Sequence, residues 1–127
     1  MDLTTNALHW FEIPVSDMDR AKKFYEEIFG FKMETQDMMG MKMAYFPADM
    51  MGGKVGGGLV ESPYHKPSAE GTKVYLNANP DLGEVLNKVE AAGGGLAMPK
   101  TKISDEIGYM ASFMDTEGNL VSLHSNG

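Results

Sequence analysis

A carboxylate stands within an apolar stretch near the start of the chain, in the sequence HWFEIPV at residues 9–15. Side chains alternate between the two faces of a strand, so Glu12 shares its face with Trp10 and Pro14. A carboxylate among apolar neighbours is costly unless it is paired, hydrogen-bonded or protonated. Glu12 is therefore either a catalytic or ligand-binding acid, base or acceptor, or a residue that bonds nearby groups and only fixes the strand.

The histidines are the other candidates for acid–base or metal chemistry. His124 lies near the end of the chain and is either a catalytic partner for Glu12 or a surface residue. His9 would join the face of Glu12 only after a shift of strand register by one residue. An improvised metal site of His9, Glu12 and His124 therefore stays open as an alternative. His65 lies in a polar stretch, and we expect it to be solvated.

Other familiar chemistries find no support in the sequence. The chain has no cysteine, which excludes disulfides and thiolate catalysis. It has no G-x-S-x-G sequence around a nucleophilic serine. The glycine triplets at 56–58 and 93–95 do not open a helix, so neither predicts a phosphate-binding loop. The first triplet instead predicts a strand that lets the backbone, a ligand or another subunit approach closely.

Length and charge restrict the possible partners. The chain has 127 residues, which predicts a single domain over 1–127, and 43% of its residues are hydrophobic. The net charge of −7 argues against binding to nucleic acid or to an anionic membrane surface. The N-terminal residues lack the basic and apolar regions of a signal peptide, and we expect a cytoplasmic protein.

An amphipathic helix follows the first strand. Ser16 or Asp17 provides a capping side chain, and Gly30 provides a left-handed end. The residues that form its apolar stripe at helical spacing are Ala21, Phe24, Tyr25 and Ile28.

The order strand, helix and three strands occurs twice. The first set comprises a strand at 11–15, a helix at 16–30 and strands at 31–35, 41–47 and 54–61. The second set comprises a strand at 72–78, a helix at 80–93 and strands at 95–99, 109–115 and 119–125. We expect an α+β fold of two βαβββ modules, about 7–61 and 72–125, joined by a polar linker at 62–71.

Each helix is expected to cover one face of a curved sheet, which leaves a cup between the two sheets. Phe11, Ile13 and Val15 would face the helix, while Trp10 and Glu12 would line the cup with Pro14.

Three features together resemble the vicinal oxygen chelate superfamily of glyoxalases, bleomycin-resistance proteins and dioxygenases. They are the sequence WFEIPVSDMDRAKKFYEEIFGFK, the ending DTEGNLVSLH and the paired modules. Within this superfamily the sequence most resembles proteins related to lactoylglutathione lyase, and the resemblance covers nearly the whole chain. It implies a glyoxalase-like fold more firmly than one activity, because the superfamily contains isomerases, lyases, dioxygenases and drug binders.

The resemblance also implies where a metal would bind. Metal-dependent members place one His or Glu on each of four strands. The matching positions here are Trp10, Gly57 or Gly58, Thr72 and Ser122, and none has an imidazole or carboxylate side chain. We therefore expect no metal cofactor, with a divalent ion such as Zn, Ni or Fe as the alternative. Trp10, Thr72 and Ser122 become, with Glu12, candidate ligand-binding residues.

Three functions remain as predictions. The first is binding of a small organic molecule in the cup, coupled to metal-independent lyase or isomerase chemistry of the glyoxalase type. The second is sequestration of such a molecule without catalysis. The third is a metal-dependent enzyme of the lactoylglutathione lyase or dioxygenase type. The resemblance further implies a homodimer whose cups form across a two-fold axis.

Overall fold

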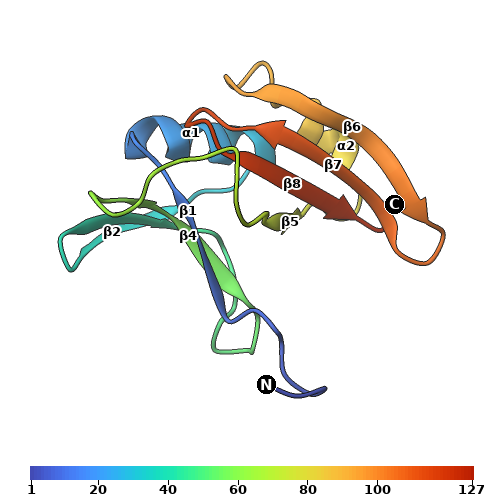
Figure 1. Ribbon diagram of the computed structural model, residues 1–127, viewed down its shortest axis with the longest axis horizontal. Coiled ribbons are helices and arrows are strands. Elements are labelled where there is room, and N and C mark those ends of the chain that lie inside the picture. Colours follow the sequence, from blue (N-terminus) through green and yellow to red (C-terminus); the bar gives the residue numbers. More distant parts are fainter.

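A computed structural model describes residues 1–127 and contains two separate four-stranded sheets, each with a helix against it (Figure 1). The first sheet has the order β1-β4-β3-β2, and its strands are β1 (Trp10–Pro14), β2 (Glu34–Met38), β3 (Met41–Tyr45) and β4 (Gly56–Glu61). The second has the order β5-β8-β7-β6, and its strands are β5 (Tyr75–Asn77), β6 (Gly95–Ser104), β7 (Gly108–Met114) and β8 (Leu120–Ser125). In both sheets the first strand of the module pairs in parallel with the fourth. The predicted α+β fold of two βαβββ modules is confirmed.

The first helix follows the sequence prediction closely. Helix α1 (Met18–Phe29) is capped by the Asp17 side chain, which accepts from the Arg20 amide. Gly30 ends it in the left-handed conformation, with φ of 75°. The whole predicted apolar stripe is buried against the core.

The second helix is shorter than predicted. We expected a helix over 80–93, but α2 (Leu82–Leu86) is followed by turns in which several amides bond three residues back, as from Val89 to Leu86. Gly83 and Asn87 are weak helix formers within this stretch. Val89 is nevertheless fully buried, so the tighter turns still bring its side chain into the core.

Two strands also begin later than predicted. The strand expected at 31–35 begins at Glu34, because Phe31 stacks on Phe29 at the end of α1, with ring centroids 5.2 Å apart. The strand expected at 72–78 is reduced to β5, which leaves Thr72 outside it. No helix is both long and apolar enough to cross a membrane.

A polar junction joins the two modules. Glu117, in the turn between β7 and β8, has a fully enclosed side chain. One of its oxygens accepts from the backbone amides of Ser16 and Asp17, each at 2.9 Å. The Arg20 guanidinium donates to both carboxylate oxygens, at 2.7 and 3.0 Å. The second module thereby satisfies amide groups at the start of α1 in the first.

The junction makes stability sensitive to acid. Burial by itself raises the pKa of Glu117, but the bonds from Arg20, Asp17, Thr116 and Ser16 outweigh it and hold the pKa below the usual range of a glutamate. The stabilisation is therefore complete above the unfolded pKa and is lost as the pH falls through the folded pKa.

We expect the free energy of unfolding by urea to fall more steeply between about pH 7 and about pH 3 in the native chain than in a Glu117→Gln variant. The comparison isolates Glu117 from the other carboxyls with lowered pKa values, namely Asp2, Glu26 and Asp81. Parallel pH profiles for the two proteins would contradict this assignment.

Candidate ligand-binding cavity

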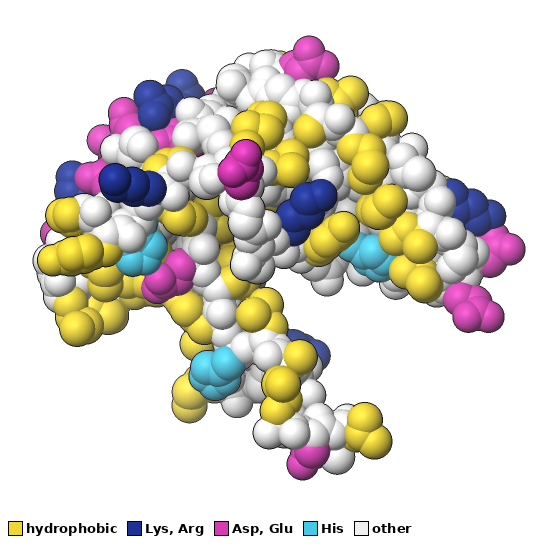
Figure 2. Space-filling view, in the orientation of Figure 1, with side chains coloured by type: hydrophobic (Ala, Val, Ile, Leu, Met, Phe, Trp, Pro, Cys, Tyr) yellow, Lys and Arg dark blue, Asp and Glu magenta, His cyan; other side chains and the backbone are white.

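An apolar cavity of about 830 Å³ lies between the start of β1, the end of α1 and the segment that leads into β5 (Figure 2). Its size is within the usual range for small-molecule sites. Ten of its fifteen lining residues are hydrophobic. The aromatic side chains among them are Trp10, Phe11, Phe29, Phe31, Phe46 and Tyr75. The remaining lining residues are Leu8, Glu12, Pro47, Val55, Thr72, Lys73, Val74, Leu76 and Asn77.

The glycines of β4 explain how Phe11 reaches this cavity. Ile13 and Val15 are buried as predicted, but Phe11 is only half-buried and lines the cavity. Its register partner is Gly57, where an added Cβ would lie 2.4 Å from the Phe11 ring. The ring therefore occupies the space that a side chain at 57 would need. Phe11 thus packs against the core, as expected, and also lines the cavity, which was not expected.

Packed rings support the aromatic wall. Phe11 lies 5.5 Å from Phe46, and Phe31 meets Phe46 edge-on at 6.0 Å between centroids. Trp10 packs edge-on against Tyr45 at 5.9 Å. Such contacts hold the rings in place before any ligand arrives, which lowers the cost of ordering them on binding.

Glu12 lies on the wall of the cavity and both its oxygens are engaged. The indole Nε1–H of Trp10 donates to Oε2 at 3.3 Å, and His65 Nε2 lies 2.8 Å from Oε1. The Glu12 side chain is 35% exposed, so it stays within reach of a ligand. Of its predicted neighbours, Pro14 does not line this cavity.

The linker supplies a residue that the sequence did not single out. His65 was expected to be solvated, but its side chain is only 19% exposed and faces Glu12. Its Nδ1 lies 2.7 Å from the hydroxyl of Ser62, which also accepts from the Tyr64 amide. A turn between Ser62 and His65 carries the ring to β1. The sequence signal was the run SPYH, because Ser and Pro favour such a turn.

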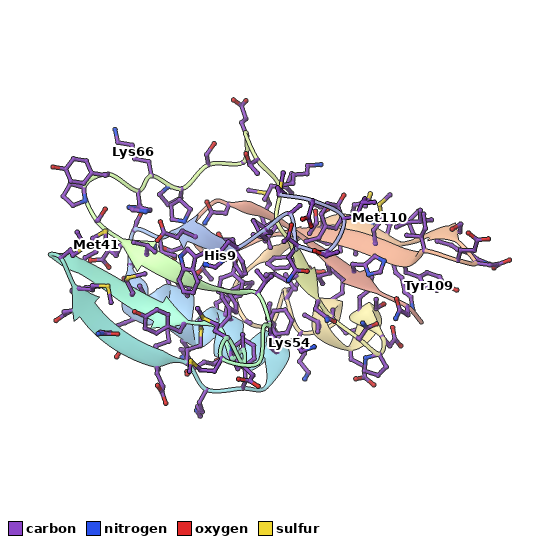
Figure 3. The ribbon with its side chains drawn as sticks, turned by 90° about the horizontal axis from the view of Figure 1, so that it is seen from below. His9, Met41, Lys54, Lys66, Tyr109 and Met110 are labelled. Carbon is purple, nitrogen blue, oxygen red and sulfur yellow. The ribbon has the colours of Figure 1, made fainter.

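A second, polar cavity of about 240 Å³ adjoins the first. The two share Glu12, Thr72 and Val74. The polar cavity adds charged and hydrogen-bonding side chains from the linker and the β8 turn, which are Lys66, Ser68, Glu70 and Asn119. Figure 3 shows Lys66 on the linker loop, away from His9.

The structure separates the remaining predicted site residues from Glu12. Ser122 is buried and hydrogen-bonded to the Ser112 hydroxyl at 2.9 Å. His124 Nε2 donates to the Ile107 carbonyl at 2.7 Å, and neither Ser122 nor His124 lines the aromatic cavity. Within one chain His124 therefore cannot act as the acid–base partner of Glu12, because β8 directs the His124 side chain to the β6–β7 turn.

The predicted metal positions do not fit a divalent ion. Trp10 uses its only polar atom as a donor to Glu12, and Gly57 and Gly58 have no side chain. The structure contains no group of three His, Cys, Asp or Glu side chains that could hold a metal. His9 is exposed and does not join Glu12 and His124.

The fold is that of an α+β protein built from two paired modules, with an apolar cavity beside the first strand. Residues 7–123 match the family model of the Glyoxalase/Bleomycin resistance protein/Dioxygenase superfamily, and the chain belongs to this superfamily. It is 31% identical over 113 residues to a glyoxylase-like domain-containing protein of Didymella fabae, covering 85% of this chain and 84% of that one. It is 30% identical to the CFP32 protein of Mycobacterium bovis, over 91% of this chain but only 44% of the longer relative.

Solved structures share the fold. A glyoxalase/bleomycin resistance protein from Streptomyces sp. CB03234 is 24% identical, covers 94% of this chain over 100% of its own, and has a TM-score of 0.69. TnmS3, an antibiotic binding protein from the same organism, is 22% identical, with coverages of 99% and 100% and a TM-score of 0.67. A glyoxalase I variant from Zea mays is 19% identical, with coverages of 93% and 45% and a TM-score of 0.66.

Proposed function

We propose that the chain binds a small organic molecule in the aromatic cavity. The observation that carries the proposal is a cavity of about 830 Å³ with six aromatic side chains and a single carboxylate, Glu12. This combination of apolar walls with few polar groups is typical of ligand sites. The antibiotic-binding neighbour TnmS3 supports the same reading.

The location of Glu12 favours a second candidate function. A carboxylate on the wall of an apolar cavity is placed to take a proton from a bound molecule. The proposal therefore has two forms. In the catalytic form the chain carries out metal-independent lyase or isomerase chemistry of the glyoxalase type. In the non-catalytic form it only sequesters the bound molecule. The catalytic form predicts that Glu12→Gln abolishes turnover while the cavity still binds a neutral aromatic molecule.

The only tryptophan of the chain, Trp10, gives a direct test. Its single indole N–H resonance in a ¹H–¹⁵N spectrum reports the cavity wall. We expect this resonance to shift in a saturable manner when naphthylmethanol, a neutral aromatic alcohol, is added. Elemental analysis of protein purified without chelator should find no stoichiometric Zn, Ni or Fe.

Two results would contradict the proposal. An unshifted indole resonance, with naphthylmethanol at its solubility limit, would remove the aromatic cavity as a ligand site. Near-stoichiometric metal, whose chelation also lowers the melting temperature by several degrees, would favour the metal-dependent alternative.

The homodimer and the cytoplasmic location expected from the sequence remain part of the proposal. Hydrophobic side chains exposed over the second sheet support a dimer (Figure 2), and Tyr75, Leu96 and Ile107 are 52%, 50% and 54% exposed. Sedimentation of a monomer at micromolar concentration would contradict it.

A further inference from the structure

We propose that the Glu12–His65–Ser62 chain is an amine-recognition site, so that the aromatic cavity selects apolar molecules carrying a protonated amine. The inference rests on the proposed function of the cavity and names the class of its ligand.

The hydrogen-bond chain fixes Glu12 as an acceptor. The Tyr64 amide donates to the Ser62 hydroxyl, which leaves the hydroxyl proton for His65 Nδ1 at 2.7 Å. His65 Nε2–H then donates to Glu12 Oε1 at 2.8 Å. A charged imidazole would donate from Nε2 in the same way, so the direction of this last bond is the same in either state of His65. With the Trp10 indole on Oε2, each Glu12 oxygen accepts one hydrogen bond and keeps capacity to accept another from a ligand in the cavity that Glu12 lines.

The surroundings of the carboxylate favour a cation over a neutral donor. Glu12 is the only acidic side chain on the wall of the aromatic cavity. The rings of Trp10 and Tyr75 line the same cavity and attract a cation that approaches their faces. A hydrogen bond to an ionised partner is about twice as strong as one between neutral groups.

Lys73 is the one feature that favours an anionic ligand, since it lines the same cavity and carries a positive charge. Lys73 belongs to the exposed residues and makes no ion pair, so a ligand that used it would have to order a long side chain. Glu12 is already held by two contacts and needs no such ordering. The structure is therefore better prepared for an amine than for a carboxylate ligand.

The position of Glu12 also tells where the amine lies in the ligand. Glu12 lines both the aromatic cavity and the polar cavity of about 240 Å³. A ligand with its rings in the first cavity and its amine at Glu12 can extend polar substituents toward Lys66, Ser68 and Glu70. The ligand class is thus an aromatic or otherwise apolar body with a basic nitrogen at the junction.

Three probes of nearly equal size test the proposal, namely naphthylmethylamine, naphthylmethanol and naphthoic acid. We expect the amine to bind roughly tenfold more tightly than the alcohol, and the acid to bind most weakly. The indole resonance of Trp10 and isothermal titration calorimetry follow binding independently.

Variants locate the preference. Glu12→Gln should weaken amine binding by about tenfold and change alcohol binding by less than about twofold. His65→Gln should reduce the ratio of amine affinity to alcohol affinity by about threefold, because the Glu12 carboxylate is then held less firmly. A purely structural role of His65 would leave this ratio unchanged. Glu106→Gln and His9→Gln are the matched controls, because they make the same chemical changes at exposed residues outside the hydrogen-bond chain. Both should leave the ratio of amine affinity to alcohol affinity unaltered.

The outcomes separate this inference from the proposed function. Binding of all three probes without preference for the amine, or with preference for the acid, overturns the amine site and leaves the cavity as a ligand site. Binding of none overturns both. An amine preference that survives Glu12→Gln also overturns the assignment to Glu12. If that variant does not fold, the ranking on the native chain together with His65→Gln decides.

Discussion

Replacing Asp115 by alanine is expected to lower the free energy of unfolding by about 4 kcal/mol. Asp115 is 5% exposed and its two oxygens accept four hydrogen bonds. The Tyr25 hydroxyl donates at 2.8 Å, and Asn119 donates from both its backbone and its side chain at 2.9 Å. The Glu117 amide completes the set at 2.8 Å. Alanine would leave these donors unpaired in the interior, each at a cost of about 1–3 kcal/mol before relaxation.

Tyr25→Phe is the matched control for this prediction. Tyr25 is fully buried, and the change removes one donor while Asp115 keeps three. We expect a loss of about 1 kcal/mol. Urea denaturation of both variants, with unchanged dependence on urea, measures the two losses. Equal losses would mean that Asp115 does not organise the turn between β7 and β8.

Gly57→Ala is expected to weaken naphthylmethanol binding about tenfold, with a smaller loss of about 1–2 kcal/mol in stability. The new Cβ would lie 2.4 Å from two atoms of the Phe11 ring, a distance that real contacts do not adopt. The ring lines the aromatic cavity, so we expect the added methyl group to push it into that space. The substitution would therefore reduce the space that is left for a ligand.

Gly95→Ala provides the control, since an added Cβ at Gly95 meets no atom within 4 Å. Its effect on stability should stay within about 0.5 kcal/mol and its effect on binding should be negligible. Calorimetric titration with naphthylmethanol measures both variants. Native affinity in Gly57→Ala would show that Phe11 does not limit the cavity.

Local patterns predicted those parts of the fold that depend on neighbours in sequence. The cap at Asp17, the end of α1 at Gly30 and the burial of Ile13 follow from capping chemistry and from strand alternation. The duplicated order of elements then indicated two modules. The short α2 was missed because helical periodicity shows which residues are buried, such as Val89, and does not show whether tighter turns bury them instead.

The candidate site was predictable only in part, because it depends on register and on distant segments. Alternation on β1 put Glu12 and Trp10 on one face, and both line the cavity. Phe11 was assigned to the opposite face, and only its register with Gly57 reveals that its ring also reaches the wall. His65 meets Glu12 across 53 residues of chain, a contact that no local pattern encodes.

The polar junction around Glu117 affects the order in which contacts form while the chain is being synthesised. Helix α2 takes its caps from Asp81 and Ser125 of its own module, whereas the amide of Ser16 waits for a carboxylate 101 residues further along. A ribosome that adds residues from the N-terminus releases α1 long before Glu117 exists. The first half of the chain therefore emerges with the amides of Ser16 and Asp17 still without this carboxylate, and these contacts form only after the turn between β7 and β8 has left the exit tunnel.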